Sequence, residues 1–210
     1  MYFRTDKVTL VNLKGANSSR KSTKMSYIVK YLIERADKVD YLEHGILIEV
    51  KGLKYFYIGK LTPKGVYVSL DCSKLQKIEV RLEYMKTVIE NHDVKVILCE
   101  GYFNNLSKRM HRLSFIKEFK IDRYEYYYFY SETVEEQEKL MSKRSVKCTS
   151  YNTVANTLKG FSEELAFFKE IQDPDCISER VDIEEPRDFF VKKFFNENRD
   201  YETKEPELDF

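Results

Sequence analysis

A strand–loop–helix segment near the N-terminus constrains this chain more than any other stretch. Residues 8–13 form an apolar, β-branched run that predicts a strand, and residues 25–33 have apolar side chains at helical spacing. Between them, Gly15 is followed six residues later by the pair Lys21-Ser22. Such a loop can wrap phosphates with its backbone N–H groups, because a helix N-terminus favours anions. The segment therefore predicts a phosphate-binding loop that contains Gly15, Asn17, Ser18, Ser19, Arg20, Lys21, Ser22 and Thr23.

One position departs from the usual pattern of such loops. The pattern G-x-x-x-x-G-K-[ST] has glycine immediately before the lysine, where this chain has Arg20. Glycine is usual there because it adopts unusual dihedrals and lets the backbone approach the phosphates closely. Three interpretations remain open. Arg20 adds positive charge to a slightly altered loop, or it marks a loop that no longer binds nucleotide, or the segment is a basic, serine-rich turn.

Composition predicts a globular protein of one α/β domain or two small ones. The 210 residues include 42% apolar residues, with 36 basic and 35 acidic side chains, so there is no overall attraction to nucleic acid or to a membrane. The cysteines at positions 72, 99, 148 and 176 and the three histidines share no metal-ligand spacing. The sequence contains no signal-peptide pattern and no membrane-spanning run. We therefore expect a cytoplasmic protein without membrane contacts.

Strand-like and helix-like segments alternate along the chain. Strands are predicted at 45–51, 55–59, 66–71, 93–101, 123–131 and 178–183, and helices at 21–36, 73–91, 107–119, 133–145, 151–171 and 186–195. Segments 45–51 and 55–59 are close enough to form a hairpin or adjacent strands. The alternation predicts a parallel sheet covered on both faces. We expect one domain over residues 1–195, followed by an acidic tail at 196–210 that is flexible or loosely docked.

Two acids follow predicted strands and are candidates for chemistry. Glu100 comes directly after the apolar run 94–99, at the edge where ligands bind in open α/β sheets. A phosphate-binding loop needs an acid on a neighbouring strand, so Ser22 and Glu100 predict a Mg²⁺ site. The alternative is an acid that begins a loop. Asp71 precedes a predicted helix, and it fits equally an N-cap and a base that receives a substrate hydroxyl proton.

Basic side chains that follow predicted strands fall into two groups: Arg109 and Arg112, and Lys139, Lys143, Arg144 and Lys147. Phosphoryl transfer needs positive charge on the transferred group, often from an arginine on a mobile segment. The second group lies where a lid would be, at about 132–150, and Arg144 is the favoured catalytic residue there. Most lysines and arginines on helices are solvated, and this remains the alternative for each of them.

Three patches carry a resemblance to a known family: the loop Gly15–Thr23, the stretch from 57–60 to 69–71, and the hydrophobic-Glu-Gly segment 96–102. With the lid-like segment around Arg144, they span about residues 8–150. The chain resembles P-loop kinases of the nucleoside and nucleotide kinase type, and is similar to small kinase-like proteins encoded by bacteriophages. The resemblance implies a three-layer α/β P-loop fold with a mainly parallel sheet, a lid and a C-terminal helical extension. Some such proteins phosphorylate nucleotides, and others phosphorylate hydroxymethylated pyrimidines in phage DNA.

These features lead to a functional hypothesis and two alternatives. The leading hypothesis is ATP- and Mg²⁺-dependent phosphoryl transfer to a nucleoside, a nucleotide or a modified DNA base, with Lys21, Asp71 and Arg144 as catalytic residues. One alternative is a degenerate P-loop protein that binds a nucleotide or a protein partner without chemistry, which Arg20 motivates. The other is direct DNA binding by the basic segment 139–147, which the neutral net charge disfavours.

Overall fold

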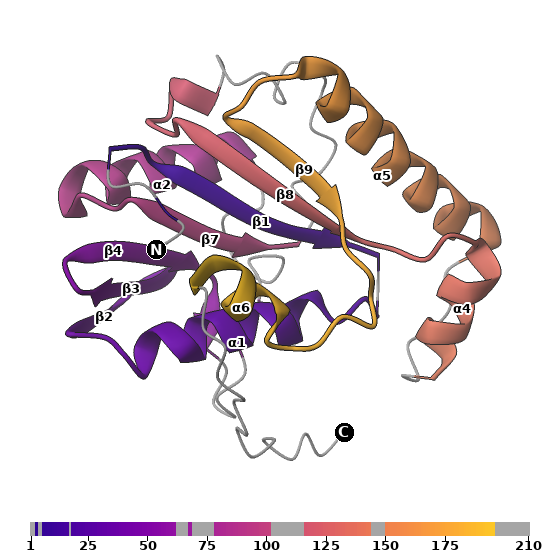
Figure 1. The fold of residues 1–210 in the computed structure, drawn as a ribbon, viewed down its shortest axis with the longest axis horizontal. Helices are drawn as coiled ribbons and strands as arrows, with labels where there is room; N and C mark the ends of the chain where they lie inside the picture. The colour runs from indigo at the N-terminus through magenta and orange to yellow at the C-terminus, as the bar shows by residue number, and fades with distance from the viewer. Residues whose placement is uncertain are drawn as a thin grey trace.

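The computed structural model describes residues 3, 6–16, 18–61, 67–68, 78–101, 116–143 and 150–195. These residues form a seven-stranded sheet with the strand order β2-β3-β4-β7-β1-β8-β9 (Figure 1). The strands are β1 (Thr9–Gly15), β2 (Lys38–Leu42), β3 (Gly45–Val50), β4 (Leu53–Ile58), β7 (Val96–Glu100), β8 (Arg123–Phe129) and β9 (Cys176–Arg180). A separate small sheet pairs β5 (Lys60–Leu61) with β6 (Tyr67–Val68). The described helices are α1 (Lys21–Ile33), α2 (Ile78–His92), α4 (Val134–Ser142), α5 (Tyr151–Ile171) and α6 (Phe189–Phe195).

The central part of the sheet is parallel. Strand β1 pairs in parallel with β7 on one side and with β8 on the other, and β4 and β9 extend this parallel set outward. Residues 9–14 of β1 are buried, as expected for a central strand with both faces covered. The mixed α/β fold and the mainly parallel sheet predicted from the sequence are therefore confirmed.

The edge of the sheet nearest β2 is antiparallel. Strands β3 and β4, predicted at 45–51 and 55–59 as a hairpin or as adjacent strands, form an antiparallel hairpin, and Lys51 and Gly52 connect them with φ values of 50° and 77°. Two left-handed residues in a two-residue loop suit the right-handed twist of a hairpin, and glycine accepts this conformation without cost. Strand β2 was not predicted, because Lys38–Leu42 is a partly exposed edge strand with alternating polar residues.

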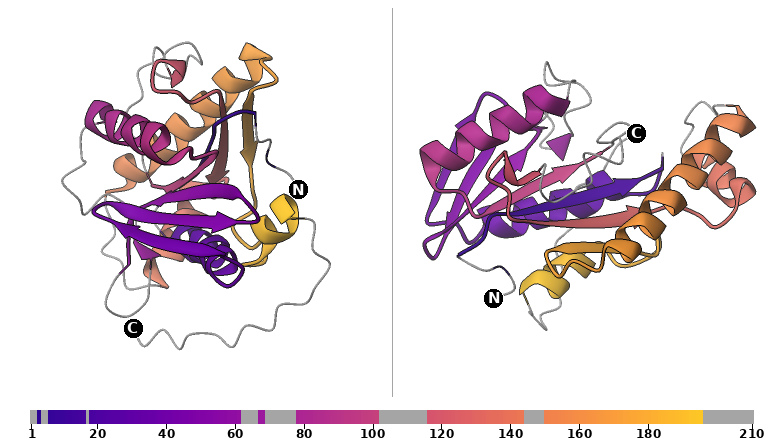
Figure 2. Two further views of the ribbon diagram at one scale, coloured as in Figure 1. Left: turned by 90° about the vertical axis from the view of Figure 1, so that its left-hand side faces the viewer. Right: turned by 90° about the horizontal axis from the view of Figure 1, so that it is seen from above.

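Helices cover both faces of the sheet (Figure 2). One face packs against α2 and α5, in a core that includes Leu82, Met85, Leu158, Phe161 and Phe168. The opposite face packs against α1 and α6, through Met25, Ile28, Phe190 and Phe194 among others. The arrangement has three layers, and the alternation of side chains along β1 sends Val11 and Leu13 to one core and Leu10 to the other.

Several predicted segments differ in length or lie outside the described residues. Helix α1 ends at Ile33 rather than 36, and β9 begins at Cys176, two residues before the predicted strand. Most of the predicted helix 107–119 and the whole tail 196–210 lie outside the described residues. Among the described helices, none has the length and apolarity needed to cross a membrane.

The buried tyrosines of β8 predict that the free energy of unfolding falls at alkaline pH. Tyr124, Tyr126 and Tyr128 pack against α5, and burial raises the pKa of each phenol above the usual 10.0. Above about pH 10 the unfolded chain loses these protons while the folded protein keeps them, so stability falls by up to about 1.4 kcal/mol per tyrosine per pH unit. Urea unfolding midpoints at rising pH, with tyrosinate absorbance, check this. Ionisation of these phenols near pH 10 in the folded protein would contradict it.

Candidate functional site

The carboxyl ends of the parallel strands bring the candidate residues to one edge of the sheet. Strand β1 ends at Gly15, β7 ends at Glu100, and β8 ends at Phe129, with Gly15 opposite Phe129 and Leu13 opposite Glu100. The loop that follows β1 leads directly into α1 (Figure 1). This is the edge where ligands bind in open α/β sheets.

Gly15 allows the loop to leave β1 in close contact with β8. A Cβ atom at Gly15 would lie 2.5 Å from the Phe129 carbonyl oxygen and 2.5 Å from Ser19 Oγ. The following amide, Ala16 N–H, donates to the same carbonyl at 3.0 Å, and Ser19 N–H donates to Ala16 O at 3.3 Å. Glycine at this position is therefore a steric requirement of the loop.

Arg20 takes a left-handed conformation at the start of α1. Its φ of 57° and ψ of 16° are values that glycine adopts freely and that cost an L-residue about 1–2 kcal/mol. Ser18 is also left-handed, with a φ of 65°. The loop thus has, at the position of the missing glycine, the kind of backbone conformation for which glycine is normally selected.

The N-terminus of α1 has the properties of an anion site. Its N-cap residue, Arg20, makes no side-chain capping hydrogen bond, and the first turn contains no acidic residue. Amide groups in the first turn of any helix lack carbonyl partners within the helix, and they carry the positive end of its dipole. The Ser18 and Ser19 hydroxyls are buried and have no hydrogen-bond partner in the described part of the chain. A chain of phosphate oxygens fits these donors.

Glu100 is well placed for a metal ion at the same edge. Its side chain is 4% exposed, and the following Gly101 N–H donates to Leu13 O at 3.0 Å. Alternation along β7 puts Glu100 on the α1 side of the sheet, with Val96 and Leu98. Among the described residues no three His, Cys, Asp or Glu side chains cluster as a metal cage. Mg²⁺ usually needs only one or two carboxylates plus phosphates and water, so Ser22 and Glu100 fit such an ion.

A cavity of about 370 Å³ opens beyond the ends of β8 and β9. Helix α4, which begins with a capping box between Thr133 and Glu136, forms one wall with Lys139 and Lys143. The connection between β9 and α6, residues 181–188, forms the opposite wall with Glu184, among others. Glu184 also lies 3.9 Å from the Arg20 guanidinium, so the cavity wall reaches the loop between β1 and α1.

Arg180 lines this cavity with its planar guanidinium. Its guanidinium donates to Glu132 at 2.9 Å and to the Tyr130 carbonyl at 3.4 Å, and it lies 5.0 Å from the centre of the Tyr130 ring. Arg180 was not among the predicted site residues, because one arginine at the end of a short strand carries no local signal.

Not all predicted site residues are brought together. The structure places Gly15, Ser18, Ser19, Arg20 and the start of α1 in one loop, with Glu100 on the adjacent strand, and it places Lys139 and Lys143 at the cavity. The other candidates that the sequence offered, Asn17, Asp71, Arg109, Arg112, Arg144 and Lys147, lie outside the described residues.

A buried polar cluster on the α5 face was also missed. Lys14, the residue before Gly15, is 2% exposed and its ammonium lies 2.8 Å from the Glu164 carboxylate on α5. Tyr128 donates to the same carboxylate at 2.8 Å, and the Lys14 ammonium lies 4.4 Å from the centre of the Tyr126 ring. Burial lowers the pKa of Lys14, and Glu164 partly counteracts this. The pair fastens α5 to the strand that leads into the loop.

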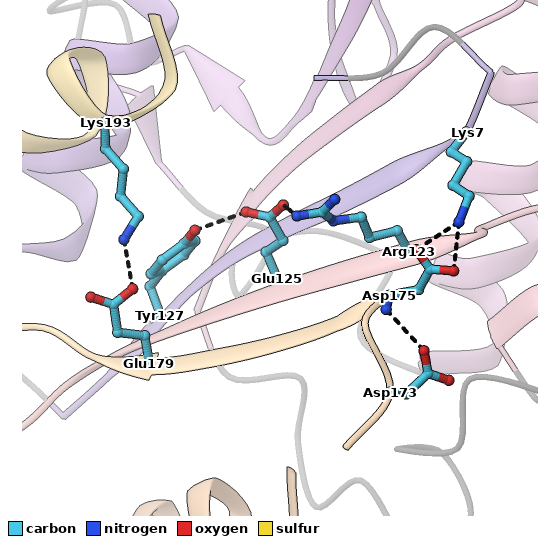
Figure 3. A network of polar contacts seen from close by, with 8 residues as sticks. All are labelled: Lys7, Arg123, Glu125, Tyr127, Asp173, Asp175, Glu179 and Lys193. Atoms are coloured by element: carbon cyan, nitrogen blue, oxygen red, sulfur yellow. Dashed lines mark hydrogen bonds and ion pairs between the residues drawn. The ribbon is translucent and has the colours of Figure 1, made fainter. Parts of the chain in front are cut away.

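A second polar network lies on the other face and holds α6 and β9 in place (Figure 3). Glu125, fully buried in β8, lies 2.9 Å from Arg123 and accepts from the Tyr127 hydroxyl at 2.8 Å. Lys193 of α6 pairs with Glu179 of β9 at 2.6 Å. The Lys193–Glu179 pair joins α6 to β9, the two elements at either end of the connection that lines the cavity.

No protein-family model and no curated protein sequence matches this chain. One solved structure that is similar is the unliganded crystal structure of a sugar kinase from a Janibacter species. It has a TM-score of 0.43 and 13% sequence identity, over 90% of this chain and 95% of that one. A likeness this distant carries no argument about function, which depends on the geometry of the site.

Proposed function

We propose that this protein transfers the γ-phosphoryl group of ATP to a hydroxyl or phosphate of a nucleoside, a nucleotide or a modified DNA base. The observation that carries the proposal is the N-terminus of α1, whose N-cap residue Arg20 makes no side-chain capping bond, beside two buried serine hydroxyls without partners in the described chain. Buried polar groups normally have hydrogen-bond partners, so orphan donors at a helix N-terminus suggest a ligand that supplies acceptors.

Each residue of the site has a proposed role. The loop amides and Lys21 hold the phosphates, while Ser22 and Glu100 hold the Mg²⁺ that accompanies them. When bound, the ion neutralises charge on the phosphate oxygens. Asp71 receives the proton of the acceptor or anchors it, and Arg144 stabilises the transferred group. Catalysis of this kind is mostly positioning and charge stabilisation, which the preformed loop can supply.

The cavity beside the loop can accommodate the nucleoside end of the donor. Its volume of about 370 Å³ is in the range of small-molecule sites. Arg180 lines the cavity with its guanidinium over the Tyr130 ring, and a flat cation of this kind stacks on planar rings. Glu184, which lines the cavity, lies 3.9 Å from Arg20, so the cavity lies beside the loop, as the proposal requires.

A phosphotransfer assay tests the proposal. The full chain is incubated with γ-labelled ATP, Mg²⁺ and a panel of nucleosides, nucleoside monophosphates and hydroxymethylated DNA. We expect label transfer by the wild type, none by Lys21→Ala, and a reduction of about 100-fold or more by Glu100→Gln. ATP binding that is equal in wild type and Glu100→Gln, with no transfer to any acceptor, would instead favour a nucleotide-binding protein without catalysis.

A further inference from the structure

Lys24 is a buried lysine in the first turn of α1. Its side chain is 1% exposed, although lysine is almost never fully buried without a partner. The ammonium donates to the backbone carbonyl of Glu185 at 2.5 Å, and it lies 5.5 Å from the centre of the Phe129 ring. Phe129 also supplies the carbonyl that accepts from Ala16 N–H. Lys24 therefore lies between the end of β8, the start of α1 and the β9–α6 connection.

Opposite charges meet where the connection crosses α1. Arg20 and Lys24 lie on the α1 side, and Asp182, Glu184 and Glu185 lie on the connection. Burial and the nearby Arg20 lower the pKa of Lys24, while these three acids counteract the shift. The Arg20–Glu184 pair is exposed and weak, so the Lys24 bond is the stronger contact of the two.

The β9–α6 connection contacts both the cavity and helix α1. Asp182, Ile183 and Glu184 line the cavity, and Glu185, directly after them, is the residue whose carbonyl Lys24 holds. Asp182 Oδ1 accepts from Glu184 N–H at 2.9 Å and its carbonyl accepts from Glu185 N–H at 3.3 Å, so residues 182–185 form a tight turn. The hydrogen bond from Lys24 to the Glu185 carbonyl therefore holds this turn against α1. It thereby sets the distance between the cavity wall and the phosphate-binding loop.

We propose that Lys24 is a positioning residue for the nucleotide: it joins the cavity wall to α1, so that the loop and the cavity act on one ligand. This rests on the proposed function, because it assumes that phosphates bind at the loop and the nucleoside in the cavity. It predicts that Lys24 contributes to the binding of a nucleotide but not to the binding of a phosphate chain without a nucleoside. A purely structural lysine would affect both ligands alike.

The test uses calorimetry to measure the affinity of the full chain for Mg²⁺-ATP and for Mg²⁺-tripolyphosphate. We expect Lys24→Met to weaken ATP binding about tenfold and tripolyphosphate binding by less than about twofold, since a hydrogen bond from a charged group is lost. Lys21→Ala weakens both. The control Lys169→Met removes an exposed lysine of α5 and changes neither.

The outcomes separate this inference from the proposed function. Equal losses for both ligands in Lys24→Met, or no loss for either, would overturn the positioning role alone. A wild type that binds neither ligand would overturn both. If Lys24→Met does not fold, hydrogen exchange of the wild type decides. ATP must slow exchange at residues 181–188 more than tripolyphosphate does, and equal protection would overturn the role.

Discussion

Replacing Glu164 with alanine is expected to lower the free energy of unfolding by about 3–5 kcal/mol. The substitution leaves the Lys14 ammonium buried without its carboxylate, and Tyr128 loses its acceptor. The aromatic rings near Lys14 attract a cation too weakly to replace the ion pair. Urea unfolding of the wild type and the variant measures the loss.

The neighbouring Glu163→Ala is the matched control. Glu163 is 68% exposed and lies 3.8 Å from Lys159, so its removal should cost less than about 0.5 kcal/mol. A similarly small loss for Glu164→Ala would show that the buried pair contributes little.

The loss of unfolding free energy caused by Glu164→Ala should also become smaller as the pH rises. Burial already lowers the pKa of Lys14 below 10.5, and removing Glu164 takes away the main counteracting charge. Between the lowered folded pKa and 10.5 the unfolded chain binds more protons than the native protein, so the stability of the variant rises with pH relative to wild type. The stability difference measured at about pH 7 and about pH 9.5 reports this. A stability difference between wild type and variant that grows with pH would contradict the lowered pKa of Lys14.

Replacing Gly15 with alanine is expected to abolish nucleotide binding and to lower the free energy of unfolding by about 1–3 kcal/mol. The new Cβ would lie 2.5 Å from a backbone oxygen of β8 that cannot rotate away, so the loop must shift. A shifted loop no longer directs its amides and serine hydroxyls to one point. Equilibrium dialysis with ATP and urea unfolding measure the two effects.

Gly52→Ala serves as its control. A Cβ there meets nothing within 4 Å, but the φ of 77° makes alanine cost about 1 kcal/mol or more. It therefore destabilises the hairpin turn between β3 and β4, far from the loop, and should leave ATP binding unchanged. ATP binding by Gly15→Ala equal to that of Gly52→Ala would show that the loop geometry is not needed.

Much of the fold was predictable because its signals are local. Apolar runs and helical spacing located the strands around β1, β7 and β8 and the long helix α5, which begins and ends where predicted. Strand β2 was not predictable, because pairing of Lys38–Leu42 with β3 depends on the packed sheet rather than on residue type.

The site was only partly predictable, because some of its residues depend on contacts between segments that are far apart in the sequence. The loop and Glu100 follow strands, so their shared edge can be deduced from chain order. Lys14 and Lys24 look like ordinary solvated lysines, and their burial depends on Glu164 and Glu185, which arrive from much later in the chain. One signal was available for Lys14: it falls within a strand that is apolar on both faces, where a lysine needs a partner.

The most direct test of the central claim is the thermal stability of the full chain with and without ATP and Mg²⁺. A ligand that binds the native state stabilises it by mass action, by about 2.7 kcal/mol at one hundred times its Kd. We expect the melting temperature of the wild type to rise with ATP and Mg²⁺, and that of Lys21→Ala to stay unchanged. No rise in the wild type with any nucleotide, or an equal rise in both proteins, would contradict a working phosphate-binding loop.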